Sequence, residues 1–196
     1  MIELLATLGR TLGFSLAAGV NLYATVAILG LASRYQWVQL PEQFRVFDNP
    51  WIIGLAGVLY VVEFVADKVP WVDSIWDSIH TLIRPIGGAL IAVASLGDAN
   101  PVVTGLIALL GGAVAASSHA TKAGTRVAAN TSPEPFSNWF LSLAEDAFVI
   151  GLSVITLKFP LIALGMSVVI LVLIVLTIRA VWRWLRQRRR PLGSAV

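Results

Sequence analysis

Two pairs of carboxylates interrupt the apolar stretches of this chain. Glu63 lies four residues before Asp67, and Glu145 is followed directly by Asp146; residues four apart share one face of a helix. An ionised group inside hydrocarbon costs roughly 3 kcal/mol, so a group retained there usually faces a partner or a cavity. Glu63 and Glu145 are therefore candidates for taking up protons or binding a cation. The alternative is that Asp67 lies in water and that each glutamate is paired and holds helices together.

Three further residues, His119, Lys122 and Arg126, recur at positions i, i+3 and i+7 among serines and threonines. This spacing places them on one helical face. The preceding Gly111 and Gly112 allow close packing, so the pattern predicts a helix that enters a water-filled vestibule attracting anions. The alternative is a helix that emerges into the cytoplasm with ordinary positive-inside residues.

The segment from Trp71 to Pro85 has a polar face opposite an apolar one. The polar residues at helical spacing are Asp73, Asp77, His80 and Arg84. We expect an amphipathic helix near residues 72–84 that lies on the cytoplasmic face of the membrane. Asp73, Asp77 and His80 could ligate a divalent metal, although a solvated face with Asp–Arg pairs is the commoner outcome of such a pattern.

The composition indicates that lipid surrounds these elements. The chain has 196 residues, of which 57% are hydrophobic and 13% are charged, against about 25% charged residues in soluble domains. In lipid the backbone must be satisfied within helices or a closed barrel, and the continuous apolar run from Leu161 to Ile178 lacks the alternation of barrel strands. The sequence therefore predicts an all-α membrane protein. It contains no cysteine and no phosphate-loop, zinc-protease or serine-hydrolase motif, and no cofactor is expected.

Six segments are long and apolar enough to cross a bilayer, which needs roughly 20 residues. They run from Thr11 to Ser33, Trp51 to Ala66, Ile79 to Leu96, Val102 to Thr121, Trp139 to Leu157 and Leu161 to Trp182. The first could be taken for a signal peptide, but it is longer than a signal-peptide core and carries Asn21 in its middle. We expect one polytopic domain, residues 1–196, with a basic cytoplasmic tail at 183–196.

The distribution of Lys and Arg predicts the orientation. With six spans and both termini in the cytoplasm, eleven of the 14 basic residues lie inside, which follows the positive-inside rule. The other three, which lie outside, are Arg34, Arg45 and Lys158. The six arginines between Arg179 and Arg190 are expected to contact anionic lipid headgroups. Nucleic acid is not an expected partner, because no recognition module accompanies these arginines.

A weak internal repeat is present in the chain. Gly13–Thr25 reads GFSLAAGVNLYAT and aligns with Gly111–Ala123, which reads GGAVAASSHATKA. The alignment makes Asn21 the counterpart of His119. Chance similarity among small residues, which are common where membrane helices pack closely, is the alternative explanation.

A second match supports a division into two halves, residues 1–98 and 99–185. PEQF at 41–44 matches PEPF at 133–136, and each motif precedes a predicted span that carries a glutamate. Because three spans separate the copies, the second half would enter the membrane from the opposite side. Such inverted three-helix repeats recur in secondary transporters.

Two stretches of the chain resemble a known family. One begins at Glu63 and reads EFVADKVPWVDSIWDSIHTLIRPIGGAL; the other begins at Gly111 and reads GGAVAASSHATKAGTRVAANTSPEPFSNWFLSLAEDA. They are similar to a family of uncharacterised bacterial integral membrane proteins, domain of unknown function 4126. The resemblance covers the chain from Gly13 to about Leu157. It implies membrane residence and assigns no activity; we expect the membrane to be the bacterial inner membrane.

These observations favour a small secondary transporter or channel-like permease, which can assemble as a homodimer or within a larger membrane complex. The residues expected to line or gate its pathway are Asn21, Glu63, His119, Lys122, Arg126 and Glu145. The alternative is a noncatalytic subunit or assembly factor of a membrane complex, for which close-packing small residues and a basic tail suffice. A membrane-embedded enzyme that uses His80 or His119 with a nearby carboxylate ranks third.

Overall fold

The computed structural model of the chain describes residues 1–130 and 135–188, which form helices joined by short connections. The helices are α1 (Ile2–Val20), α2 (Leu22–Arg34), the 3₁₀ helix η1 (Glu42–Asp48), α3 (Pro50–Ala66), α4 (Pro70–Leu96), α5 (Pro101–Asn130), α6 (Pro135–Lys158) and α7 (Pro160–Arg188). Every helix from α3 onward begins at a proline, whose missing N–H would be unpaired at a helix start in any case. No strand occurs in these two ranges, which confirms the all-α class.

Four helices are long and apolar enough to cross a membrane, so the chain is a multi-pass membrane protein. They are Pro70–Leu96, Pro101–Asn130, Phe136–Lys158 and Pro160–Arg183. A fifth span results if η1 and α3, which are bent by 65° relative to each other, are counted together. The prediction of six spans is not confirmed, because the first predicted span has a different structure.

Asn21 divides the first predicted span into two helices. The single helix expected from Thr11 to Ser33 is wrong, because Asn21 has φ −146° and ψ 101°, outside the helical region. The Asn21 N–H donates to Ala17 O at the end of α1, and its Oδ1 accepts a hydrogen bond from Ala24 N at the start of α2. An asparagine side chain competes with helical hydrogen bonds, so it favours the cap of a new helix over the interior of a long one.

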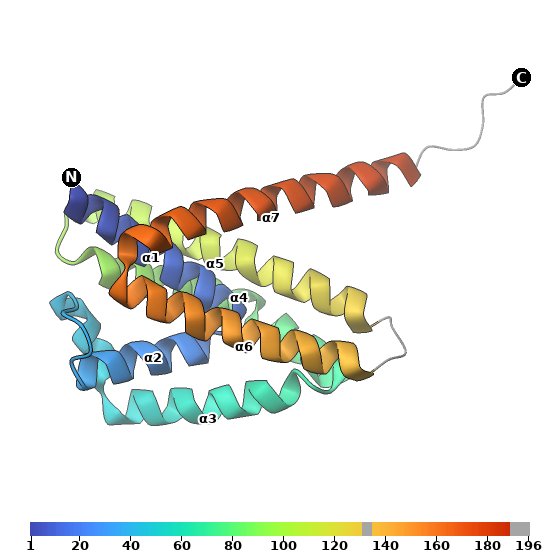
Figure 1. Cartoon of the computed structure of the whole chain (residues 1–196), viewed down its shortest axis with the longest axis horizontal. Helices are drawn as coiled ribbons and strands as arrows, with labels where there is room; N and C mark the ends of the chain where they lie inside the picture. Colours follow the sequence, from blue (N-terminus) through green and yellow to red (C-terminus); the bar gives the residue numbers. More distant parts are fainter. Residues whose placement is uncertain (131–134, 189–196) are drawn as a thin grey trace, which may run out of the picture.

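α1 and α2 form a hairpin that returns to the end of the molecule at which it started (Figure 1). Near the start of α1, Gly9 packs against Pro160 in the α6–α7 connection. At the end of α2, Arg34 pairs with Asp48 just before α3. We call this end, with η1 and the α4–α5 and α6–α7 connections, the η1 end. The opposite end, where α3 connects to α4 and where α5 ends, is the far end.

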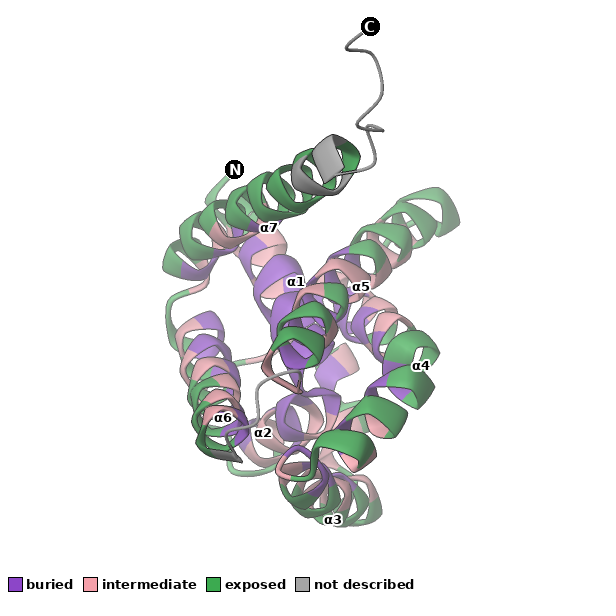
Figure 2. Cartoon of the chain, turned by 90° about the vertical axis from the view of Figure 1, so that its right-hand side faces the viewer, coloured by how far each residue is buried: buried purple, intermediate pink, exposed green. Residues whose placement is uncertain are grey.

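α1 lies in the centre of the bundle, where Figure 2 shows it buried among the other helices. It runs parallel to α5: Ser118 Oγ donates to Leu16 O and, one turn later on both helices, Lys122 Nζ donates to Val20 O. The predicted inverted relation between these two segments is therefore not seen. The hairpin does not cross the molecule, so α5 enters from the same end as α1. Of the second sequence match, at 133–136, the first two residues lie outside the described chain.

α4 is one helix of 27 residues that continues through Pro85, so the surface helix predicted near 72–84, followed by a short span, is wrong. Its polar face points inward, with Asp73, Asp77, His80 and Arg84 all buried. Its exposed face is apolar and includes Trp71, Ile75, Ile79 and Leu82. The amphipathic pattern is real, but in lipid the apolar face is the outer one and the polar face needs partners inside the bundle.

Candidate functional site

A cluster of buried charges lies towards the far end, where α3, α4, α5 and α6 meet. Its three fixed cations are Arg84, Lys122 and Arg126. Its six carboxylates are Glu63, Asp67, Asp73, Asp77, Glu145 and Asp146. All of these residues are buried except Glu145, whose side chain is 16% exposed. We call this set the charge cluster.

Arg84 on α4 is fully enclosed and joins three helices. Its Nη2 donates to Glu63 Oε1 over 2.7 Å, and its Nη1 lies 3.2 Å from Asp77 Oδ1. Nη1 also donates to His119 Nδ1 over 2.6 Å. Because Nδ1 accepts this bond, the proton of His119 lies on Nε2, which is 3.2 Å from Thr81 Oγ1. The hydrogen bonds of this arrangement therefore fit a neutral His119.

Lys122 on α5 is surrounded by three carboxylates. Its Nζ lies 3.0 Å from Asp67 Oδ2, 3.3 Å from Glu63 Oε1 and 3.5 Å from Glu145 Oε2. These oxygens come from α3, from its C-terminal cap and from α6. Because three acceptors at similar distances compete for one ammonium group, a change of charge on any of them redistributes its hydrogen bonds.

Arg126, one turn further along α5, links α3 to α6. Its Nε donates to Glu145 Oε1 over 3.0 Å and its Nη2 donates to Glu145 Oε2, which makes a bidentate pair. Nη2 also donates to Asp67 Oδ2 over 3.1 Å, and Nη1 donates to Asp67 O over 2.8 Å. Asp73 Oδ1 lies 4.0 Å from Nε. The alternative in which Lys122 and Arg126 emerge into the cytoplasm is therefore wrong.

The break between α1 and α2 belongs to the same site. The last carbonyl groups of a helix have no partners within it, and here Gly19 O accepts from Arg84 Nη1 while Val20 O accepts from Lys122 Nζ. Cations are favoured at this end of a helix by its dipole. Two cations of the charge cluster thus bind the turn of the hairpin and the carboxylate of Glu63 at the same time.

The predicted metal ligands Asp73, Asp77 and His80 do not converge. His80 Nδ1 donates to Trp76 O over 2.7 Å, and His80 Nε2 accepts from the Tyr23 hydroxyl over 2.8 Å, so both ring nitrogens are engaged. Within residues 1–130 and 135–188, no group of three or more His, Cys, Asp or Glu residues has the geometry of a metal site. The stretch instead supplies partners for the cations of the charge cluster.

Carboxylates outnumber cations in the charge cluster. Buried oxygens without a hydrogen-bond partner among the described residues include Glu63 Oε2, Asp67 Oδ1 and Asp146 Oδ2. Lys68 adds one positive charge at the far end, and its burial lowers the pKa of its ammonium group against the opposing charges of Asp146 and Asp67. Even with Lys68 the carboxylates are in excess, and unpaired buried charge is costly. Neighbouring carboxylates in such an excess favour the protonation of one another, so the arrangement can hold protons.

A cavity of about 290 Å³ between α5, α6 and α7 reaches the charge cluster. Lys122 and Glu145 contribute to its wall, together with Thr121, Thr125 and Phe148. The cavity therefore reaches the ion pair between Lys122 and Glu145. Glu145, which is partly exposed, is the carboxylate in the wall of this cavity.

The six residues predicted to line a pathway lie in or beside the charge cluster. Glu63, Lys122, Arg126 and Glu145 belong to it, His119 binds its Arg84, and Asn21 lies at the helix break. The sequence interpretation missed Arg84 as the partner of Glu63, because the polar face of its helix was assigned to water. The available signal was the spacing of Asp77 and Arg84 opposite an unbroken apolar face.

One protein family, described as a domain of unknown function (DUF4126), has a sequence model that matches residues 8–180. This match confirms the resemblance found in the sequence and extends it beyond the range from Gly13 to Leu157. No curated protein and no solved structure shows a significant match to the chain.

Proposed function

We propose that this chain, which belongs to the DUF4126 family, is a small secondary transporter or channel-like permease whose pathway for protons or small cations runs through the charge cluster. Ionisable groups inside a membrane protein commonly mark ion and proton pathways. Interrupted helices in transporters place helix ends at such sites, and here the end of α1 meets Arg84 and Lys122.

The observation that carries the proposal is the excess of buried carboxylates over cations at the turn of the hairpin. A permanent excess of ionised groups in a low-dielectric interior is unfavourable, so the ionisation of one carboxylate depends on the others and on any bound cation. A purely structural network would gain more from matched charges. A site that binds and releases positive charge requires such an excess of carboxylates over fixed cations.

Each member of the charge cluster then has a role. Glu63, Asp67 and Glu145 are the groups that take up or release a proton or cation. Lys122 moves among these three oxygens as their charges change, because it contacts all of them. Arg84 holds the turn of the hairpin against Glu63 and couples the two.

We further propose that the protein resides in the bacterial inner membrane with the far end in the cytoplasm. Lys68 lies at this end, and α7 carries its arginines towards it (Figure 1), as the positive-inside rule requires. In this proposal η1 and α3 together form a fifth crossing beside the four candidate spans, and the α1–α2 hairpin returns to its own side, so the N-terminus lies on the opposite side from the end of α7. The arrangement predicted from the sequence, with both termini cytoplasmic, is the alternative to this proposal.

Solid-supported-membrane recordings on proteoliposomes test the proposed transport. Steps of pH, NaCl or KCl should displace charge in the wild-type protein. Glu63→Gln and Glu145→Gln should reduce the response at least about tenfold, equivalent to roughly 1.4 kcal/mol, because an amide cannot take up the charge. His119→Ala should also reduce it, since Arg84 loses a partner that fixes its position.

Glu42→Gln is the matched control, because Glu42 is an exposed carboxylate at the η1 end that pairs with Arg45. Its response should equal that of the wild type. The proposal is wrong if the wild type responds to none of the three steps, or if all three charge-cluster variants respond like the wild type.

A subunit or assembly factor of a membrane complex is the second candidate, and one observation favours it. From Val175 onward, every side chain of α7 whose burial the structure describes is exposed, so this part of the helix offers a surface to a partner protein. Purification in a mild detergent separates the two candidates: a stoichiometric partner protein supports the subunit, and a homogeneous homo-oligomer or monomer supports the transporter.

A further inference from the structure

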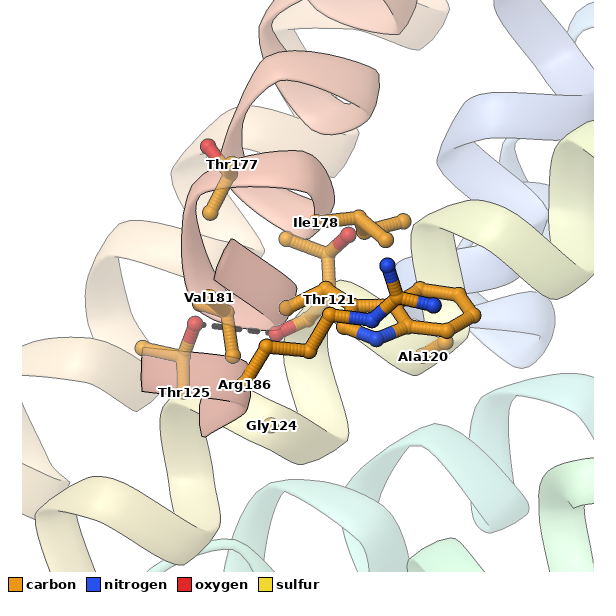
Figure 3. A pocket seen from close by; sticks show the side chains of 9 residues that line it. Ala120, Thr121, Gly124, Thr125, Thr177, Ile178, Val181 and Arg186 are labelled. Carbon is orange, nitrogen blue, oxygen red and sulfur yellow. Dashed lines mark hydrogen bonds between the residues drawn. The ribbon is translucent and has the colours of Figure 1, made fainter. Parts of the chain in front are cut away.

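A groove of about 730 Å³ separates α5 from the second half of α7 (Figure 3). Its α5 wall consists of Ala120, Thr121, Gly124 and Thr125. Its α7 wall consists of Thr177, Ile178, Val181, Trp182 and Arg186. The groove forms because α7 packs on α1 with its first half and then diverges from α5 towards the far end (Figure 1).

The walls of the groove favour an alkyl chain over a polar ligand. Thr121 Oγ1 donates to Ser117 O and Thr125 Oγ1 donates to Thr121 O, so neither hydroxyl has a proton free for a ligand. Of the remaining lining residues, Ala120, Gly124, Ile178 and Val181 are aliphatic or glycine, and Thr177 contributes a third hydroxyl. The volume lies in the range of sites for small molecules.

One end of the groove is basic and aromatic. The Arg186 guanidinium lies 5.2 Å from the centre of the Trp182 ring and extends across the groove in Figure 3. Arg183 lies exposed on the same helix, one residue from Trp182. Neither α5 nor α7 contains an Asp or Glu residue, so neither wall of the groove brings a carboxylate to this end.

We infer that the groove binds an anionic phospholipid, with one acyl chain between α5 and α7 and the headgroup phosphate on Arg186. Charge complementarity carries the choice of ligand: an apolar channel that ends in a guanidinium matches an acyl chain that ends in a phosphate. Trp182 lies at the end of the candidate span Pro160–Arg183, and indole rings prefer the level of the headgroups. Basic pockets between membrane helices bind anionic headgroups. The inference does not depend on transport.

Two substitutions test the two halves of this site. Gly124→Trp fills the groove, and the fold should tolerate it because a Cβ at Gly124 meets no atom within 4 Å. Arg186→Gln removes the charge but keeps the groove. Gly105→Trp is the matched control, since Gly105 is an equally open position on α5 outside the groove.

The readout is native mass spectrometry of the full chain released from nanodiscs of equal phosphatidylglycerol and phosphatidylcholine. The wild type and Gly105→Trp should retain one phosphatidylglycerol at least about tenfold more often than phosphatidylcholine. Arg186→Gln should abolish that preference, and Gly124→Trp should abolish retention of both lipids. Equal retention of the two lipids by the wild type overturns the inference. So does a lipid-free dimer that Gly124→Trp dissociates, because the occupant is then a second copy of the chain.

Discussion

The two ends of the molecule hold ion pairs of the same chemistry in opposite surroundings. At the η1 end, Arg34 lies 3.4 Å from Asp48, and the two side chains are 45% and 37% exposed. Towards the far end, Arg84 lies 2.7 Å from Glu63, and both side chains are 0% exposed. An exposed pair contributes about 0–1 kcal/mol. A buried pair loses its hydration, and replacing it with apolar residues is often neutral or stabilising.

The ion pairs at the two ends therefore differ in how much they can contribute to stability. The pair at the η1 end is an ordinary surface contact between α2 and the segment before α3. The charge cluster is retained where an apolar core would serve stability as well, and it includes carboxylates in excess of their partners. Stability alone therefore does not account for it. The comparison supports the proposal that the charge cluster carries the function, whereas the pair at the η1 end connects α2 to the segment before α3.

The largest expected effect is the loss of Arg84. Arg84→Met should lower the free energy of unfolding by roughly 3–5 kcal/mol, because Glu63 and Asp77 keep their buried charge without a partner. Unfolding by sodium dodecyl sulfate in mixed micelles measures it. Adding Glu63→Leu and Asp77→Leu should recover at least half of the loss. A cost below about 1 kcal/mol for Arg84→Met would show that the two ends do not differ as described.

Part of the charge cluster could be predicted from the sequence because its geometry is local. The spacing of Glu63 and Asp67, and that of Lys122 and Arg126, places each pair on one helical face, and both pairs do lie together inside. The apolar length of α5, α6 and α7 likewise predicted three of the four candidate spans. These features depend on residues within a few turns of one another.

The features that were not predicted depend on distant residues. The break at Asn21 leaves carbonyl groups at the end of α1 that accept hydrogen bonds from Arg84 and Lys122, more than sixty residues away. The orientation of α4 also requires its partners: periodicity shows that a helix has two faces, but which face turns inward depends on whether water or lipid lies outside.

Asn21 and Asn49 are both N-cap residues, one inside the bundle and one at the surface, so the cost of losing each cap can be compared. Asn21 Oδ1 accepts from Ala24 N inside the bundle, and Asn49 Oδ1 accepts from Trp51 N at the surface. Loss of an asparagine cap costs about 1 kcal/mol, with a range of roughly 0.5–2. Asn21→Ala should lie at the upper end and Asn49→Ala at the lower end, because water can replace the cap of α3. Equal costs in the same unfolding assay would contradict this distinction.

The smallest expected effect is the loss of the exposed pair. Arg34→Ala should lower the free energy of unfolding by less than about 0.5 kcal/mol, since its guanidinium is partly hydrated and its distance to Asp48 is long for a charged hydrogen bond. Raising the salt concentration should reduce even this effect, because exposed charges are screened. The response of the variant to steps of pH or salt should match that of the wild type. A loss of charge displacement in Arg34→Ala would mean that the η1 end takes part in transport, because α2 would then transmit the change from Arg34 to the turn at Asn21.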